Sequence, residues 1–192
     1  MKRIKAIART VGEAAQISAV LVGVIFIVHL LNGMVGMQLN VFGIRPRTTI
    51  GLVGIICSPF LHANAAHVTA NCSALLVLLF LLFLNRKYRA EETLLLIWFG
   101  SGLGTWLIGR SSYGGKPEVH IGASSIIYGL IVYLIAAGWW MKGWRPVVAA
   151  LVVLFLYAGA IYGIWPSNSH VSWEGHLSGV IAGWLVARYQ HG

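Results

Sequence analysis

The stretch at residues 66–84 reads AHVTANCSALLVLLFLLFL and contains no Asp, Glu, Lys or Arg. Its last eleven residues, from Ala74 onward, are all apolar, and the run ends at Asn85-Arg86-Lys87. A helix needs about 20 largely apolar residues to cross the hydrocarbon core of a bilayer. The stretch therefore predicts a membrane-spanning helix that begins with polar residues, among them His67 and Asn71, and then becomes wholly apolar.

Five other stretches of the chain have a similar character. Hydrophobic residues make up 58% of the 192 residues and charged residues only 10%, whereas a typical soluble domain has about 25% charged residues. The sequence therefore predicts an all-α integral membrane protein, a compact bundle of six transmembrane helices that forms a single domain over residues 1–192. The expected spans are about 17–36, 66–84, 93–109, 122–140, 147–165 and 173–189, and a long apolar loop is expected at 37–65.

The basic residues indicate how the helices are oriented. If the N-terminus lies inside, ten of the 14 Lys and Arg residues fall in inner segments and four in outer ones. Cytoplasmic loops carry such an excess, so we expect both termini in the cytoplasm. The net charge of +9 comes from short clusters between apolar runs, which favours contact with the lipid bilayer and not with nucleic acid. No transit-type leader is evident, so we expect a prokaryotic plasma (inner) membrane.

Polar side chains are concentrated in three segments of the expected spans. These segments are His62 to Asn71, His120 to Ser125 and Trp173 to Gly183, at the starts of the second, fourth and sixth helices. In the expected topology, all three helices run inward from the outer face. Polar groups inside a membrane are costly and commonly functional. We therefore expect one functional site near the outer face.

A serine nucleophile is the chemistry that this set of residues supports best. Ser124 follows a Gly-Ala pair, whose small side chains allow close approach of neighbouring helices. A nucleophilic serine needs a general base within hydrogen-bond reach, and the candidates at matching depth are His67, His120 and His176. The chain contains no Asp, and Glu174 would lie roughly opposite His176 on its helix. A Ser–His dyad is therefore favoured over a Ser–His–acid triad.

Each of these residues also has a purely structural interpretation. Ser124 could be a helix N-cap, and His176 could be a packing residue. His67 and Asn71 are four residues apart on one helical face, so they could donate hydrogen bonds to a carbonyl oxygen or form an interhelical hydrogen bond. We interpret His29 and His191 as structural or solvated. Only the combination indicates a catalytic site.

The sixth expected helix also carries a packing motif. Gly179 and Gly183 form a small-xxx-small face, and His176 lies on roughly the same side of the helix. We expect this face to pack His176 against a neighbouring helix, such as the one that carries Ser124.

Three motifs together resemble those of the rhomboid intramembrane serine proteases. The segments His67-Val-Thr-Ala-Asn71, Gly122-Ala-Ser124 and His176-Leu-Ser-Gly179-Val-Ile-Ala-Gly183 are similar to the HxxxN, GxSx and HxxGxxxG patterns of that family. The resemblance covers nearly the whole chain. It implies that Ser124 is the nucleophile and His176 the general base, while His67, Asn71 and the Ser124 backbone N–H stabilise the oxyanion. Supporting roles are implied for His62, Gly122, Ser125, Tyr128 and Gly179.

The implied function is an intramembrane endopeptidase that cleaves transmembrane protein substrates near the outer face, with no metal or cofactor. Small residues are expected at the cleavage site, and the segment 147–172 resembles the substrate gate of the family. Two features depart from the family pattern. Ser125 occupies the place of the usual glycine after the nucleophile, and the frequent Trp-Arg pair of the first outer loop is replaced by Arg45-Pro46-Arg47.

Two other functions compete with proteolysis. The chain could be a catalytically weak or inactive rhomboid-like binder of membrane proteins, which only Ser125 favours. It could also bind a metal or a small solute, because five of the seven histidines lie in outer segments, namely His62, His67, His120, His170 and His176. Zinc sites commonly use four ligands, and no Cys or acidic residue joins these histidines in a recognised spacing.

Overall fold

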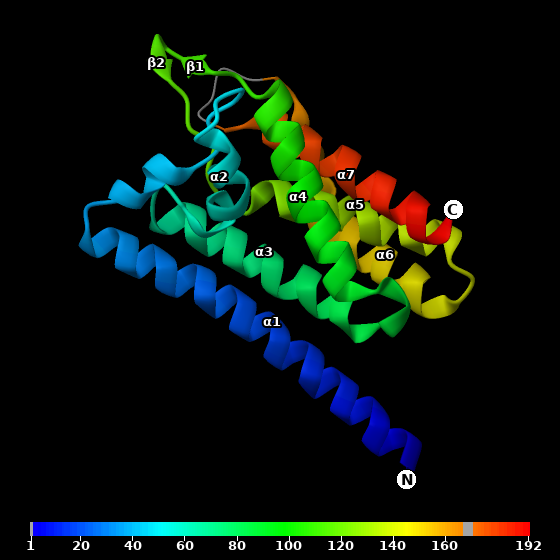
Figure 1. The fold of residues 1–192 in the computed structure, drawn as a ribbon. Coiled ribbons are helices and arrows are strands. Elements are labelled where there is room, and N and C mark those ends of the chain that lie inside the picture. The colour runs from blue at the N-terminus through cyan, green and yellow to red at the C-terminus, as the bar shows by residue number, and fades with distance from the viewer. Residues whose placement is uncertain (1, 167–170) are drawn as a thin grey trace.

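The described part of the chain is almost entirely helical. The computed structural model describes residues 2–166 and 171–192, with side chains from residue 11 onward. The long helices are α1 (Lys2–Met34), α3 (Ala65–Leu84), α4 (Ala90–Ile108), α5 (Ser124–Trp140), α6 (Trp144–Tyr157) and α7 (Trp173–His191). The shorter elements are η1 (Gln38–Phe42), α2 (Gly51–Cys57), η2 (Ser58–Phe60), η3 (Arg86–Tyr88), β1 (Ser112–Tyr113), β2 (Lys116–Pro117) and η4 (Ala158–Ile164). Figure 1 shows the β1–β2 hairpin projecting at one end of the bundle.

Each expected span coincides with a long helix, and three of them are long and apolar enough to cross a membrane. These three are Val11–Met34, Ala65–Leu84 and Trp144–Ile164, the last being α6 continued through η4. Helix α5 is apolar but has only 17 residues. Helices α4 and α7 carry Glu, Gly and Ser residues that lower their hydropathy. The fold is therefore all-α with membrane-crossing helices, and the count of six spans stays a prediction.

Helix α7 packs closely along α5. A Cβ at Gly179 would overlap the carbonyl oxygen of Ser125, and a Cβ at Gly183 would overlap the carbonyl oxygen of Gly129. The two backbones can approach this closely only because both positions are glycine. The predicted packing face on the sixth span is confirmed, and its partner is the helix that begins at Ser124.

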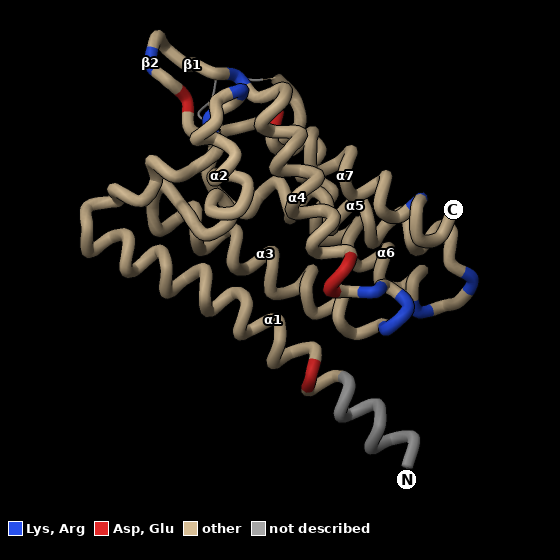
Figure 2. The backbone as a smooth tube through the Cα atoms, viewed as in Figure 1, with Lys and Arg blue, Asp and Glu red and all other residues tan. Residues whose placement is uncertain are grey.

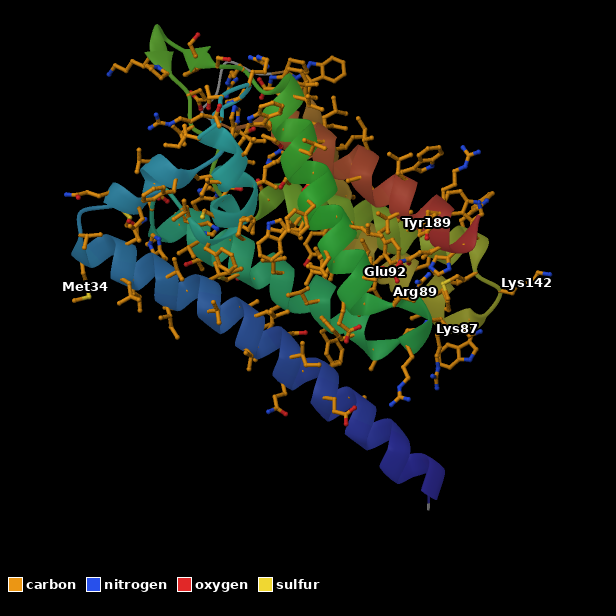
Figure 3. All side chains as sticks on the ribbon, in the orientation of Figure 1. Met34, Lys87, Arg89, Glu92, Lys142 and Tyr189 are labelled. Carbon is orange, nitrogen blue, oxygen red and sulfur yellow. The ribbon has the colours of Figure 1, made fainter. Side chains whose placement is uncertain are left out.

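Charged residues gather toward the ends of the long helices and leave the middle of the bundle uncharged, as Figure 2 shows. Figure 3 labels Lys87, Arg89, Glu92, Lys142 and Tyr189 near the end at which α7 finishes, and Met34 near the opposite end of α1. This is the distribution that a bilayer requires of its spanning helices. Helix α1 begins and α7 ends toward the same end (Figure 1), and which side of a membrane that end faces stays a prediction.

The loop between α1 and α3 contains η1, α2 and η2, and it is anchored on the end of α4. The guanidinium of Arg47 donates to the carbonyls of Leu107 at 2.8 Å and Gly109 at 2.9 Å. In return, the indole N–H of Trp106 donates to the carbonyl of Thr48 at 2.8 Å. An arginine of the loop and a tryptophan of α4 therefore share the anchoring, although the two residues are far apart in the sequence.

Candidate active site

Ser124 and His176 meet where two helices begin. Ser124 is the first residue of α5, and His176 lies in the first turn of α7. The hydroxyl oxygen of Ser124 is 3.0 Å from Nε2 of His176. Both side chains are in first turns, so the close packing of α7 on α5 brings them together. Of the three candidate bases, His176 is the one that is hydrogen-bonded to Ser124 within the described residues.

A backbone carbonyl fixes the position of the proton on His176. Nδ1 of His176 lies 2.8 Å from the carbonyl oxygen of Gly163 in η4. A carbonyl oxygen can only accept, so Nδ1 carries the proton and Nε2 presents its lone pair to the Ser124 hydroxyl. Glu174 does not orient the imidazole, because its carboxylate lies toward Arg110, with Oε1 3.8 Å from Nε. Sequence analysis missed Gly163, whose contribution comes entirely from its backbone.

The ring of Tyr128 stacks on the imidazole of His176. The two rings stack with centroids 4.1 Å apart and planes 11° from parallel. The Tyr128 hydroxyl donates to the carbonyl of Ala160 at 2.8 Å. A Cβ at Gly163 would overlap that hydroxyl and lie 3.1 Å from Nδ1 of His176. Tyr128 and His176 therefore both bind carbonyls of η4, and η4 fits over them only with glycine at position 163.

A glycine turn places backbone N–H groups at the start of α5 beside Ser124. Gly122 has φ +109°, a conformation that favours glycine, and its N–H donates to the Ser58 carbonyl at 2.9 Å. This turn leads directly into α5, so the N–H groups of Ser124 and Ser125 lie in the first helical turn. Such groups have no acceptor within their own helix, and they carry the positive end of the helix dipole. The start of α5 is therefore suited to binding an oxyanion beside Ser124.

The structure places His67 beside the turn that precedes Ser124, and the oxyanion role expected of Asn71 stays a prediction. A Cβ at Gly122 would lie 2.7 Å from Nε2 of His67, so the imidazole rests on the turn that precedes Ser124. The side-chain amide of Asn71 donates to the carbonyl of His67 at 2.9 Å. Asn71 is buried, and its Oδ1 has no hydrogen-bond partner among the described residues. His67 and Asn71 thus share one face of α3, and the Asn71 amide is bonded to the backbone of the same helix.

The ring of a second histidine, His62, contacts the ring of His67. His62 is fully buried and makes an edge contact with His67, with ring centroids 4.9 Å apart. His29 of α1 is also buried, with its ring centroid 6.3 Å from that of His62, so His29 is not solvated. Burial lowers the pKa of His62 to about 4, and the charges of His67 and His29 add to this effect. His62 is therefore neutral at physiological pH.

The side chain of Ser125 contacts α4. Its hydroxyl lies 3.3 Å from Oγ of Ser101 in α4. The Cβ that replaces the glycine usual in the family is thus accommodated against α4. Beside Ser124 lies a small, partly open cavity. Its polar lining consists of Ser58, Thr105, His120, Ser124, Ser125 and Ser172.

The histidines of the metal-binding hypothesis do not form a recognisable metal site in the residues that the structure describes. No group of three His, Cys, Asp or Glu residues there is arranged to hold a metal ion. His170, one of the five histidines in the metal-binding hypothesis, lies outside the described residues.

The comparison with known proteins agrees with the motifs. The family model of the Rhomboid domain matches residues 49–191, which is most of the chain and includes all three polar segments. The chain belongs to the rhomboid family. With its long apolar helices, this rhomboid is an integral membrane protein. Helix α1, with His29, precedes the matched region.

Relatives of this rhomboid are found in mycobacteria. Uncharacterized proteins of Mycobacterium tuberculosis and Mycobacterium bovis are each 45% identical to it over 172 residues, which cover 88% of this chain and 71% of theirs. An uncharacterized protein of Mycobacterium leprae is 37% identical over 169 residues, covering 86% of this chain and 66% of its own. No solved structure matches the chain significantly.

Proposed function

We propose that this rhomboid is a serine endopeptidase that cleaves transmembrane segments of other membrane proteins near the outer face of the bilayer. One observation carries the proposal, namely the hydrogen bond of 3.0 Å between Ser124 Oγ and Nε2 of a His176 whose other nitrogen donates to a carbonyl. This is the tautomer that a general base needs in order to accept a serine proton.

The proposed reaction is acyl transfer through Ser124. As Oγ bonds to the scissile carbonyl carbon, its proton moves to Nε2 of His176. The negative charge on the substrate oxygen is stabilised by the Ser124 N–H and by His67, which rests on the adjacent turn. The tetrahedral species then expels the amine, which takes the proton from Nε2. Water attacks the acyl-enzyme, with His176 again as the base, and releases the second product.

The shape of the site favours small residues at the cleavage position. The turn at Gly122 and the close contact between α5 and α7 crowd the surroundings of Ser124, beside which lies a small, partly open cavity. A substrate helix must also unwind locally before its carbonyl can reach Ser124, because helical carbonyls are bonded within the helix. The hydroxyl groups that line the cavity provide a polar route for the water that hydrolyses the acyl-enzyme.

Covalent labelling tests the proposal directly. A fluorophosphonate probe should label the purified wild-type protein, and a model single-span substrate should be cleaved by it. Both activities should disappear in Ser124→Ala and in His176→Ala. Ser73→Ala is the matched control, because Ser73 is an exposed serine of α3 outside the site.

Two results would reject the proposal. Labelling that persists in Ser124→Ala would mean that another residue reacts. A folded wild-type protein that binds the substrate without cleaving or labelling would support an inactive membrane-protein binder. In that case, Ser125→Gly restoring activity would identify Ser125 as the cause.

A further inference from the structure

A second serine–histidine contact lies one helical turn outside the proposed dyad. The hydroxyl oxygen of Ser172 is 2.6 Å from Nδ1 of His120, and His120 is buried. His120 precedes Ser124 by four residues, and Ser172 precedes His176 by four. The same two chain segments therefore meet twice, and neither His120 nor Ser172 forms or breaks a bond in the reaction proposed above.

The hydrogen-bond partners of His120 and Ser172 show which atom is the donor and which the acceptor in each bond. Nε2 of His120 lies 3.0 Å from the carbonyl oxygen of Arg110, and a carbonyl only accepts, so Nε2 carries the proton. In the neutral imidazole, Nδ1 is then an acceptor for the Ser172 hydroxyl. The Ser172 oxygen in turn accepts from the N–H of Gly175 at 3.1 Å, as the N-cap of α7. The result is a continuous chain of donors that runs from the first turn of α7 to the end of α4.

The neutral form of His120 fits its surroundings. Burial lowers its pKa, and the positive charge of Arg110 acts in the same direction. The hydrogen bond to the Arg110 carbonyl and the carboxylates of Glu174 and Glu118 oppose this shift. Burial is the largest of these effects, so the imidazole remains neutral at physiological pH and the donor chain stays as described.

The backbone of His120 is also fixed. His120 and Ile44 exchange two backbone hydrogen bonds of 2.9 Å each, which pair the loop between α1 and α3 with the segment before α5. Gly109 lies next to the His120 ring, since a Cβ at Gly109 would be 3.0 Å from Nε2 of His120. His120 is therefore held by the first loop and by the end of α4, and through Ser172 it holds the start of α7.

The other contacts between α5 and α7 lie deeper in the bundle. Gly179 and Gly183 fix the separation of the two helices one and two turns below His176. Above His176, Arg110 also reaches the start of α7: its guanidinium donates to the Val171 carbonyl at 3.0 Å and lies 3.8 Å from Glu174. From the residues immediately before α5, the described link to the start of α7 is the bond between His120 and Ser172. A hydrogen bond such as that of Ser124 and His176 weakens steeply with distance, and a displacement of about 1 Å can cost two orders of magnitude in rate.

We propose that His120 is a positioning residue: by binding the Ser172 hydroxyl it sets the spacing of the α5 and α7 starts, and thereby the Ser124–His176 distance. This inference rests on the proposed protease function. It assigns no contact with substrate to His120. It predicts that the hydroxyl of Ser172 and the imidazole of His120 act as one unit, beyond the role of Ser172 as a helix cap.

A double-mutant cycle distinguishes the His120–Ser172 hydrogen bond from the role of Ser172 as the N-cap of α7. Ser172→Ala and His120→Leu should each lower kcat about tenfold with little change in KM, since each breaks the same bond. The double variant should be no more than twofold worse than His120→Leu alone, because the bond is already absent in that background. Ser172→Thr retains the hydroxyl and should regain most of the wild-type kcat. Thermal unfolding of each variant reports whether it folds.

Ser178→Ala is the matched control on the same helix. The Ser178 hydroxyl donates to the Glu174 carbonyl of its own helix at 2.7 Å, so its loss leaves the two helix starts linked. The proposal is overturned if Ser172→Ala behaves like Ser178→Ala, or if the two losses multiply in the double variant. A wild-type protein that neither labels nor cleaves would instead overturn the protease function, which keeps the two failures distinct.

Discussion

The substitution Gly163→Ala should disable the proposed base without altering either member of the dyad. The added Cβ would overlap the hydroxyl of Tyr128 and come within 3.1 Å of Nδ1 of His176. Tyr128 cannot retreat freely, because its ring is stacked on the imidazole at 4.1 Å. The strain is relieved if η4 moves outward, and this movement withdraws the Gly163 carbonyl from His176.

The size of the effect follows from the bond that is lost. In the ground state the Gly163 carbonyl accepts from a neutral imidazole, but after proton transfer it accepts from an imidazolium. Hydrogen bonds to charged groups contribute about 1.5–3 kcal/mol, and each 1.4 kcal/mol corresponds to a factor of ten in rate. We therefore expect kcat for cleavage of a single-span substrate to fall about 10- to 100-fold. Without the Gly163 carbonyl, His176 can also adopt the tautomer that is protonated on Nε2, which cannot accept the serine proton. This lowers kcat further.

Gly159→Ala provides a matched control within the same segment. Gly159 also lies in η4, but a Cβ there meets no atom within 4 Å. Steady-state cleavage and the rate of fluorophosphonate labelling should therefore be near wild type in Gly159→Ala. Combining Gly163→Ala with Tyr128→Phe removes the overlapping hydroxyl and should recover part of the activity. Equal kcat values for Gly163→Ala and Gly159→Ala would refute the orienting role of this carbonyl.

Three further predictions concern the surroundings of the dyad. Gly122→Ala should abolish labelling of Ser124 while the protein remains folded, because φ is +109° and the new Cβ would lie 2.7 Å from Nε2 of His67; unchanged labelling would contradict this. Arg47→Ala should lower the free energy of unfolding by about 1–3 kcal/mol, measured by denaturant titration against the exposed control Arg86→Ala, since it removes two charged donors from the carbonyls at the end of α4. Stability should also fall between pH 6.5 and pH 4, because His62 has a pKa near 6.5 when unfolded and about 4 when buried, so the unfolded state binds the proton first. At pH 5 this effect is about 2 kcal/mol, and a His62→Gln variant with the same pH dependence as wild type would show that other groups cause it.

Hydropathy predicts the positions of the long helices well, because the cost of placing charged residues in a bilayer dominates the choice of spanning segment. The expected span at 66–84 and the observed helix Ala65–Leu84 differ by one residue. The first loop was harder to predict. Helix α2 has seven residues, too few to show a helical period. The anchoring hydrogen bonds of Arg47 and Trp106 join residues that are far apart in the chain, and no sequence pattern pairs them.

The candidate site likewise contains residues that the sequence reveals and residues that it does not. Ser124, His176 and Tyr128 are recognisable because their side chains carry the chemistry and lie at helical spacings. Gly163 acts through a carbonyl, which every residue has, so its side chain gives no chemical signal. His29 did give a signal, because an imidazole within an apolar span is unusual, and its contact with His62 depends on how α1 packs. The His120–Ser172 contact was hidden because both residues lie in loops.

The carbonyl of Gly163 orients the imidazole of His176, the proposed base, without placing an ion among the membrane-crossing helices. A carboxylate in the same place would carry a full negative charge, and burying an ion in a low-dielectric medium costs several kcal/mol even after relaxation. A peptide group is neutral, and η4 already contains it. During the proposed reaction the imidazolium and the oxyanion would arise together and disappear together, so the net charge of the site would be zero at every stage. A catalytic centre assembled from dipoles needs no counter-ion, and this allows it to lie among helices whose surroundings are hydrocarbon.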